Sequence, residues 1–525
     1  MKSELLLLLC CIAAASVSCN GIVSDDGEGV PYDEISHDMI VLGDKLDDPY
    51  SVSNIKAALA KAYPTKAGRV SVVATDLYVR FLPESEKDYD RLVALGLNLM
   101  DHPLDYEIVR DGDYYHDPEL DESAITWQYA VVPPDFNFPK DIRYEILDEC
   151  FIPGGGSATR SDDGIDWTVV EAISYAMTGN SSMLGQDVKG ETLAHAPKGR
   201  ITVRDDSHGK SREEGLAGVK ISCNTFVKFA SAYTDNDGQY EMDRTFTTEL
   251  RYRIVFQNKS GFSIGLNKIL VPASSSTMGK SGPEGVSLTV DSNSDKRLFA
   301  RCVVNNASYD YFERCKEEGK TLEPPPSNVR FWIFQSLENS ACLMTQHGVM
   351  IDDTFIGEFL GDFSNLVKMF LPDIILGAKG MEQYSSIYAQ TVHELAHASH
   401  FSKAGKGYWN KYADFIINSF LNTGGMLYGT ESTEGAGYCE VGEMWAYFIQ
   451  NILYKERYGD DMATFGTSYW FKPHILLYLN ERGLGRTEIM AALDPEVCSR
   501  ESLKSRLETL YPDYHTVISQ AFERY

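Results

Sequence analysis

The spacing of two histidines, His393 and His397, with Glu394 between them in the run HELAH, is the feature that most constrains this chain. Residues i and i+4 lie on one face of an α-helix, with Cβ atoms about 6 Å apart. No Pro or Gly interrupts the surrounding run, which predicts a helix that Ser385 or Ser386 caps. Two imidazoles on that face can bind one metal ion. Glu394 then lies beside the ion, where it can take a proton from a bound water.

A metal ion that performs chemistry needs three protein ligands and an open position. The downstream candidates are Glu440 and Glu443, one helical turn apart in the run EVGEMWAYF. Glu443 is the preferred third ligand and Glu440 the alternative, with the other carboxylate free to bind a histidine ring nitrogen. His400 is a candidate for the surroundings of the metal or a buried structural histidine. As a third ligand it is excluded, because positions i, i+4 and i+7 of one helix spread over about 10 Å.

The HExxH run and the sequence from Glu443 to Phe448 (EMWAYF) resemble the two ligand-bearing helices of gluzincin metallopeptidases. The resemblance implies one Zn²⁺ per chain, held by His393, His397 and Glu443. It further implies that the chain hydrolyses peptide bonds in a peptide or protein substrate, with Glu394 as the catalytic base. The fold that it implies for residues 299–525 is an α+β zincin-like domain.

Two further expectations follow from the same resemblance. Gluzincins often stabilise the oxyanion of the tetrahedral intermediate with a downstream Tyr or His, and the candidates here are Tyr438, Tyr469 and His474. Zincins usually hold the peptide on an edge strand upstream of the HExxH helix, and Leu343–Ile351 is predicted to be that strand.

The first residues have the features of an export signal. Residues 1–18 begin with a basic start and continue in an apolar stretch too short to span a bilayer. The run SVSC ending at Cys19 resembles a lipobox, which implies acylation of Cys19, for example by palmitate. Residues 19–29 then form an acidic tether, similar to that of surface-displayed lipoproteins of Bacteroidetes. We expect an exported outer membrane lipoprotein at the cell surface, attached to the membrane through its N-terminal lipid.

Changes in the pattern of strand-like and helix-like segments divide the rest of the chain into parts and predict a multidomain fold. Residues 30–198 are predicted to form a β-rich N-terminal domain, in which Asp166 caps a helix. Residues 199–298 are predicted to be all-β. Their runs Thr234–Tyr240 (TDNDGQY) and Leu250–Phe256 resemble the Ig-like sandwich of carboxypeptidase regulatory-like domains. The zincin-like domain follows.

The net charge and the absence of certain motifs exclude some classes of partner. The chain has 48 Lys and Arg against 76 Asp and Glu, a net charge of −28, which argues against nucleic acid. It lacks a P-loop and a dinucleotide-binding glycine motif, which argues against nucleotides. The alternative to a peptidase is a surface glycan- or protein-binding lipoprotein with an inactive zincin-like domain. The retained Glu394 favours the enzyme, because a binding protein has no need of the base.

Overall fold

The computed structural model describes residues 39–121, 124–154, 164–184, 194–265, 275–317, 322–335, 340–349, 372–423, 428–462 and 470–525. The predicted signal and tether, with Cys19, lie outside these ranges, as does Tyr469. Within them the protein is multidomain, with four β-sheets and ten α-helices, most of them C-terminal. In the same ranges, no helix has the length and hydropathy needed to cross a membrane.

The N-terminal region contains a two-stranded sheet, β1-β3, and a three-stranded sheet of order β4-β2-β5. Its elements are β1 (Val41–Lys45), α3 (Val52–Ala62), β2 (Asp76–Leu82), α4 (Glu86–Ala94), β3 (Tyr106–Arg110), β4 (Gln128–Val132), β5 (Arg143–Cys150) and α5 (Trp167–Met177). Asp166 caps α5 as predicted, because its side chain accepts a hydrogen bond from the Thr168 N–H.

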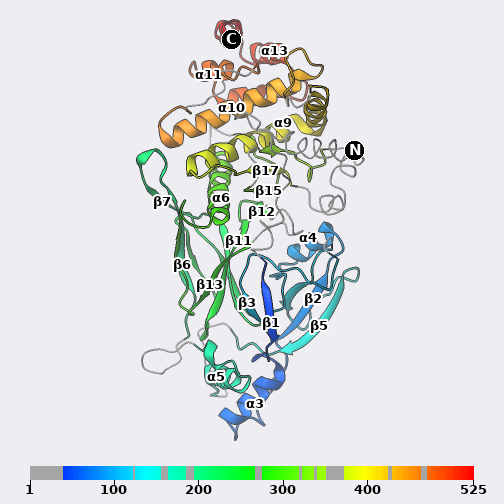
Figure 1. Cartoon of the computed structure of the whole chain (residues 1–525), viewed down its shortest axis with the longest axis vertical. Helices are drawn as coiled ribbons and strands as arrows, with labels where there is room; N and C mark the ends of the chain where they lie inside the picture. The colour runs from blue at the N-terminus through cyan, green and yellow to red at the C-terminus, as the bar shows by residue number, and fades with distance from the viewer. Residues whose placement is uncertain are drawn as a thin grey trace.

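Two sheets packed face to face follow, in the middle of Figure 1. The first consists of β6 (Lys198–Asp205), β7 (Arg212–Gly215), β10 (Gln239–Glu241) and β14 (Leu288–Val290). The second contains β8 (Val219–Thr225), β9 (Lys228–Tyr233), β11 (Leu250–Asn258) and β13 (Ser275–Ser281). Strand β8 alternates, so Val219, Ile221 and Cys223 enter the shared apolar core while Lys220 and Ser222 face the other side.

The second sheet continues into the C-terminal part of the chain. Four more strands extend it: β12 (Phe262–Gly265), β15 (Val329–Phe334), β16 (Ala341–Cys342) and β17 (Ile374–Gly377). Its order is β16-β17-β15-β12-β11-β8-β9, and β12, β15 and β17 run parallel. The sheet therefore takes strands from both sides of residue 299, and α6 (Lys296–Arg314) contributes to the same core. The domain boundaries given above stay predictions.

The expected strand Leu343–Ile351 is wrong in its described part. The edge strand is β16, two residues earlier, and the chain turns directly after it. The N–H groups of Leu343 and Met344 both donate to the Asp373 carbonyl, and Met344 has a φ of 52°, which ends the extended conformation. Residues 350 and 351 lie outside the described ranges.

Helices make up the remainder and cover one end of the molecule, at the top of Figure 1. They are α9 (Tyr384–Thr423), α10 (Ala436–Tyr458), α11 (His474–Asn480), α12 (Arg486–Ala492), α13 (Arg500–Leu510) and α14 (His515–Arg524). Helix α9 bends at Gly405, where φ is 80°. It begins at Tyr384, so the predicted caps Ser385 and Ser386 lie inside its first turn. The Ser385 N–H instead donates to the hydroxyl of Ser207.

Candidate metal centre

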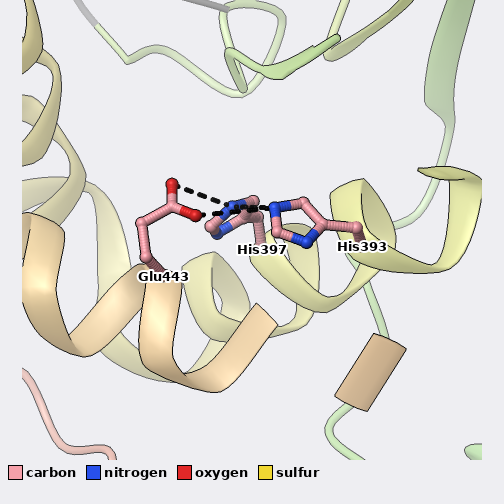
Figure 2. Close-up of side chains that lie close together, drawn as sticks. All are labelled: His393, His397 and Glu443. Carbon is pink, nitrogen blue, oxygen red and sulfur yellow. Dashed lines mark hydrogen bonds and ion pairs between the residues drawn. The ribbon is translucent and has the colours of Figure 1, made fainter. Parts of the chain in front are cut away.

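Three buried side chains from two helices converge on one point (Figure 2). His393 and His397 come from α9, and Glu443 comes from α10. The two Nε2 atoms are 3.2 Å apart, and the Glu443 carboxylate lies 3.6 Å from His393 Nε2 and 3.5 Å from His397 Nε2. The three candidate ligand atoms all lie within 4.8 Å of one another, so this group could hold a metal ion.

Packing of α9 against α10 places the ligands. The HExxH turn is lined on its other sides by Val392, Leu395 and Ala396, all buried in the core. The Trp445 indole N–H, two residues after Glu443, donates to the Ala396 carbonyl at 3.0 Å. This hydrogen bond joins α10 directly to the turn that bears both histidines, and it fixes the position of one helix along the other.

Two further side chains orient the ligands, and neither was predicted. The Nδ1 of His393 lies 3.3 Å from Gln450 Oε1, so an N–H at Nδ1 leaves the Nε2 lone pair directed at the centre. The Tyr412 hydroxyl donates to Glu443 Oε1 at 2.7 Å. Gln450 could have been found from sequence, because it lies two helical turns after Glu443. Tyr412 could not, because it reaches the site from beyond the bend in α9.

Glu394 is buried beside the ligands and next to the sheet edge. Gln390 Nε2 donates to its Oε1 at 2.8 Å, and the backbone N–H of Cys342 in β16 also donates to its carboxylate. Burial, supported by the charge of Glu443, raises the pKa of Glu394 to about 8. A carboxyl group with a pKa near neutrality can both accept and return a proton.

The charges of the three ligand side chains are coupled. Burial opposes ionisation of Glu443, but the two histidines outweigh it and hold the pKa of that carboxyl below its ordinary value. Burial also opposes protonation of His393, yet Glu443 and Glu394 raise its pKa. For His397 burial prevails and lowers the pKa, which favours the neutral imidazole that binds metals.

Glu440, the alternative ligand, is engaged elsewhere. The Arg500 backbone N–H donates to Glu440 Oε2 at 3.0 Å, and the Arg500 Nε lies 3.3 Å from Oε1. Glu440 thus binds the first turn of α13. Of the two glutamates that sequence left open, the structure brings Glu443 to the histidines.

His400 lies one turn beyond His397 and is fully buried. Its ring packs edge-on against Tyr408 and Trp409, and burial lowers its pKa to about 3. Neither ring nitrogen has a hydrogen-bond partner among the described residues. These contacts fit the structural reading of His400 rather than a ligand role.

The candidate oxyanion stabilisers have other contacts. Lys411 donates to the Tyr438 hydroxyl at 3.1 Å, and the ring of His474 stacks on that of Tyr525. Their role, like that of Tyr469, stays a prediction.

Two imidazoles and one carboxylate are the donor set of catalytic zinc sites that keep a fourth position open for water. The arrangement of His393, His397 and Glu443 fits such an ion. No protein-family model, no curated protein and no solved structure matched the chain when it was compared with them.

Proposed function

We propose that the protein is a lipid-anchored, zinc-dependent peptidase. One observation carries the proposal: two imidazoles and one carboxylate converge next to the buried side chain of Glu394. A metal site that serves only structure is closed by four ligands and has no need of an adjacent base. The part of the chain that the structure describes supplies three ligands, and a three-ligand site with Glu394 beside it is suited to hydrolysis.

The chemistry divides between the ion and the chain. A zinc ion held by His393, His397 and Glu443 would supply Lewis-acid chemistry and would lower the pKa of bound water to about 7. Glu394 takes a proton from the attacking water and passes it to the nitrogen of the leaving amine. Gln390 and the Cys342 N–H hold the Glu394 carboxylate in place during both transfers.

The sheet supports one position for a peptide substrate. Strand β16 is the last of the described strands in its sheet, and it borders Glu394 through the Cys342 N–H. An extended peptide can add to such an edge through main-chain hydrogen bonds, which places a scissile bond near the metal. The expected N-terminal lipid places this activity at the outer membrane surface, with peptides or proteins there as substrates.

The test compares the wild-type protein with Glu394→Gln, which keeps the size of the side chain and removes the base. We expect both proteins to retain about one zinc per chain, because Glu394 is not a ligand. Cleavage of a peptide library should require zinc, stop with a chelator and be lost in Glu394→Gln.

Glu440→Gln is the matched control, since Glu440 lies on the ligand-bearing helix but contacts Arg500. It should retain both zinc and cleavage. A wild-type protein that binds no zinc and cleaves no peptide would contradict the proposal and favour the surface binding protein with an inactive zincin-like domain.

A further inference from the structure

A cavity of about 480 Å³, lined by both apolar and polar side chains, lies where the N-terminal region meets the large sheet, and none of its lining residues belongs to α9 or α10. One wall is the face of that sheet opposite its apolar core. Lys220 and Ser222 of β8 and Arg253 and Gln257 of β11 line it there. Helix α4 and the segment after it form the other wall. The volume lies within the range of small-molecule sites, about 300–1,000 Å³.

Direct contacts between α4 and the sheet hold the two walls of the cavity together. Tyr89 of α4 and Ile125 pack on Trp332 of β15, and Glu86 forms an ion pair with Arg330. The cavity is therefore a fixed space between joined parts rather than a gap between separate bodies.

Lys220 is unusual among the cations that line this space. Arg253 pairs with Asp111 at 3.3 Å and Arg330 pairs with Glu86, whereas no carboxylate pairs with Lys220 among the described residues. Its Nζ donates to Asn98 Oδ1 at 2.8 Å, so within the described ranges two of its three N–H donors stay available. Burial lowers its pKa.

The acids around the cavity are occupied or lie at its rim. Asp113 pairs with Arg301 at 2.5 Å, and Asp101 accepts from His102 and from the Tyr115 N–H. Asp90 is exposed. A second donor is also unused: the Nε of Arg253 is buried and has no hydrogen-bond partner within the described chain.

We propose that this cavity binds a small hydroxylated monocarboxylate, with its carboxylate on the Lys220 ammonium. One unpaired positive charge matches one negative charge, and a charge-assisted hydrogen bond in a partly desolvated site is strong. The amide of Gln257 and the hydroxyl of Ser222 supply partners for ligand hydroxyl groups. This ligand class and site are independent of the metal centre.

The test is calorimetric titration of the full chain with glucuronate as the probe, and with glucose as its neutral counterpart. We expect one glucuronate site per chain and no binding of glucose. Lys220→Met should weaken glucuronate binding about tenfold or more. Lys280→Met, an exposed lysine of β13 in the same sheet, should bind like the wild type.

Thermal unfolding without ligand gives a second readout. A lysine kept for binding imposes a desolvation cost, so Lys220→Met should melt at a higher temperature than the wild type. Absence of glucuronate binding, equal binding to Lys220→Met, or a lower melting temperature for this variant would overturn the proposal. Neither readout depends on zinc or on peptide cleavage.

Discussion

Replacement of Tyr412 by phenylalanine tests whether the side chains that contact the metal ligands control the affinity of the site for zinc. The substitution removes only the hydroxyl that donates to Glu443 Oε1 at 2.7 Å. A hydrogen bond to a charged group stabilises by about 1.5–3 kcal/mol. Only the part of this energy that is gained on zinc binding changes the affinity, and groups that orient metal ligands typically contribute about 10- to 100-fold, so we expect a loss of zinc affinity in that range.

The assay is a zinc titration of the full chain in competition with a chromophoric chelator. Tyr408→Phe is the matched control. Tyr408 lies one turn before Tyr412 in α9, and its hydroxyl donates to the Tyr438 carbonyl at 2.6 Å rather than to a metal ligand. We expect Tyr408→Phe to keep the wild-type zinc affinity. Equal affinities for wild type and Tyr412→Phe, or equal losses in both variants, would refute the reasoning.

Two further predictions concern stability. Lys228 and Glu171 form a buried ion pair at 2.9 Å between β9 and α5. Lys228→Met should lower the free energy of unfolding in urea by about 3–5 kcal/mol, and the double variant Lys228→Met with Glu171→Leu should recover most of that stability. A loss below about 1 kcal/mol for the single variant would contradict this prediction. Burial raises the pKa of Asp48 to about 8. A raised carboxyl pKa contributes stability below its unfolded pKa and loses it as pH rises through the folded one. Asp48→Asn should therefore gain stability relative to wild type between about pH 4 and pH 8; a pH-independent difference would exclude this role.

Local patterns were sufficient for some parts of the structure. The helix that bears HELAH and the cap at Asp166 depend on residues within a few positions, and both are present. The pleat of β8 is equally local, since alternating residues determine which face enters the core.

Other parts depend on residues far apart in the chain. Glu440 and Glu443 lie on the same helix. The N–H of Arg500, about sixty positions later in the chain, donates to Glu440, and this distant contact distinguishes the two glutamates. Ser207, almost 180 positions before Ser385, accepts the N–H at the start of α9, so no local cap was needed. These choices come from tertiary packing, which spacing within one segment does not encode.

The position of the edge strand in the sequence could not be predicted from local residues either. The segment 343–349 was predicted to be a strand, but the carbonyl of Asp373 accepts two of its N–H groups and turns the chain. The resulting short β16 still reaches Glu394 through Cys342.

Anomalous X-ray scattering at the zinc edge, from crystals of the full chain grown with zinc, tests the central claim most directly. We expect one strong peak bonded to Nε2 of His393, Nε2 of His397 and the carboxylate of Glu443, each at about 2.0–2.2 Å. A map with no peak at this position, or with zinc bound to the histidines but not to Glu443, would contradict the account.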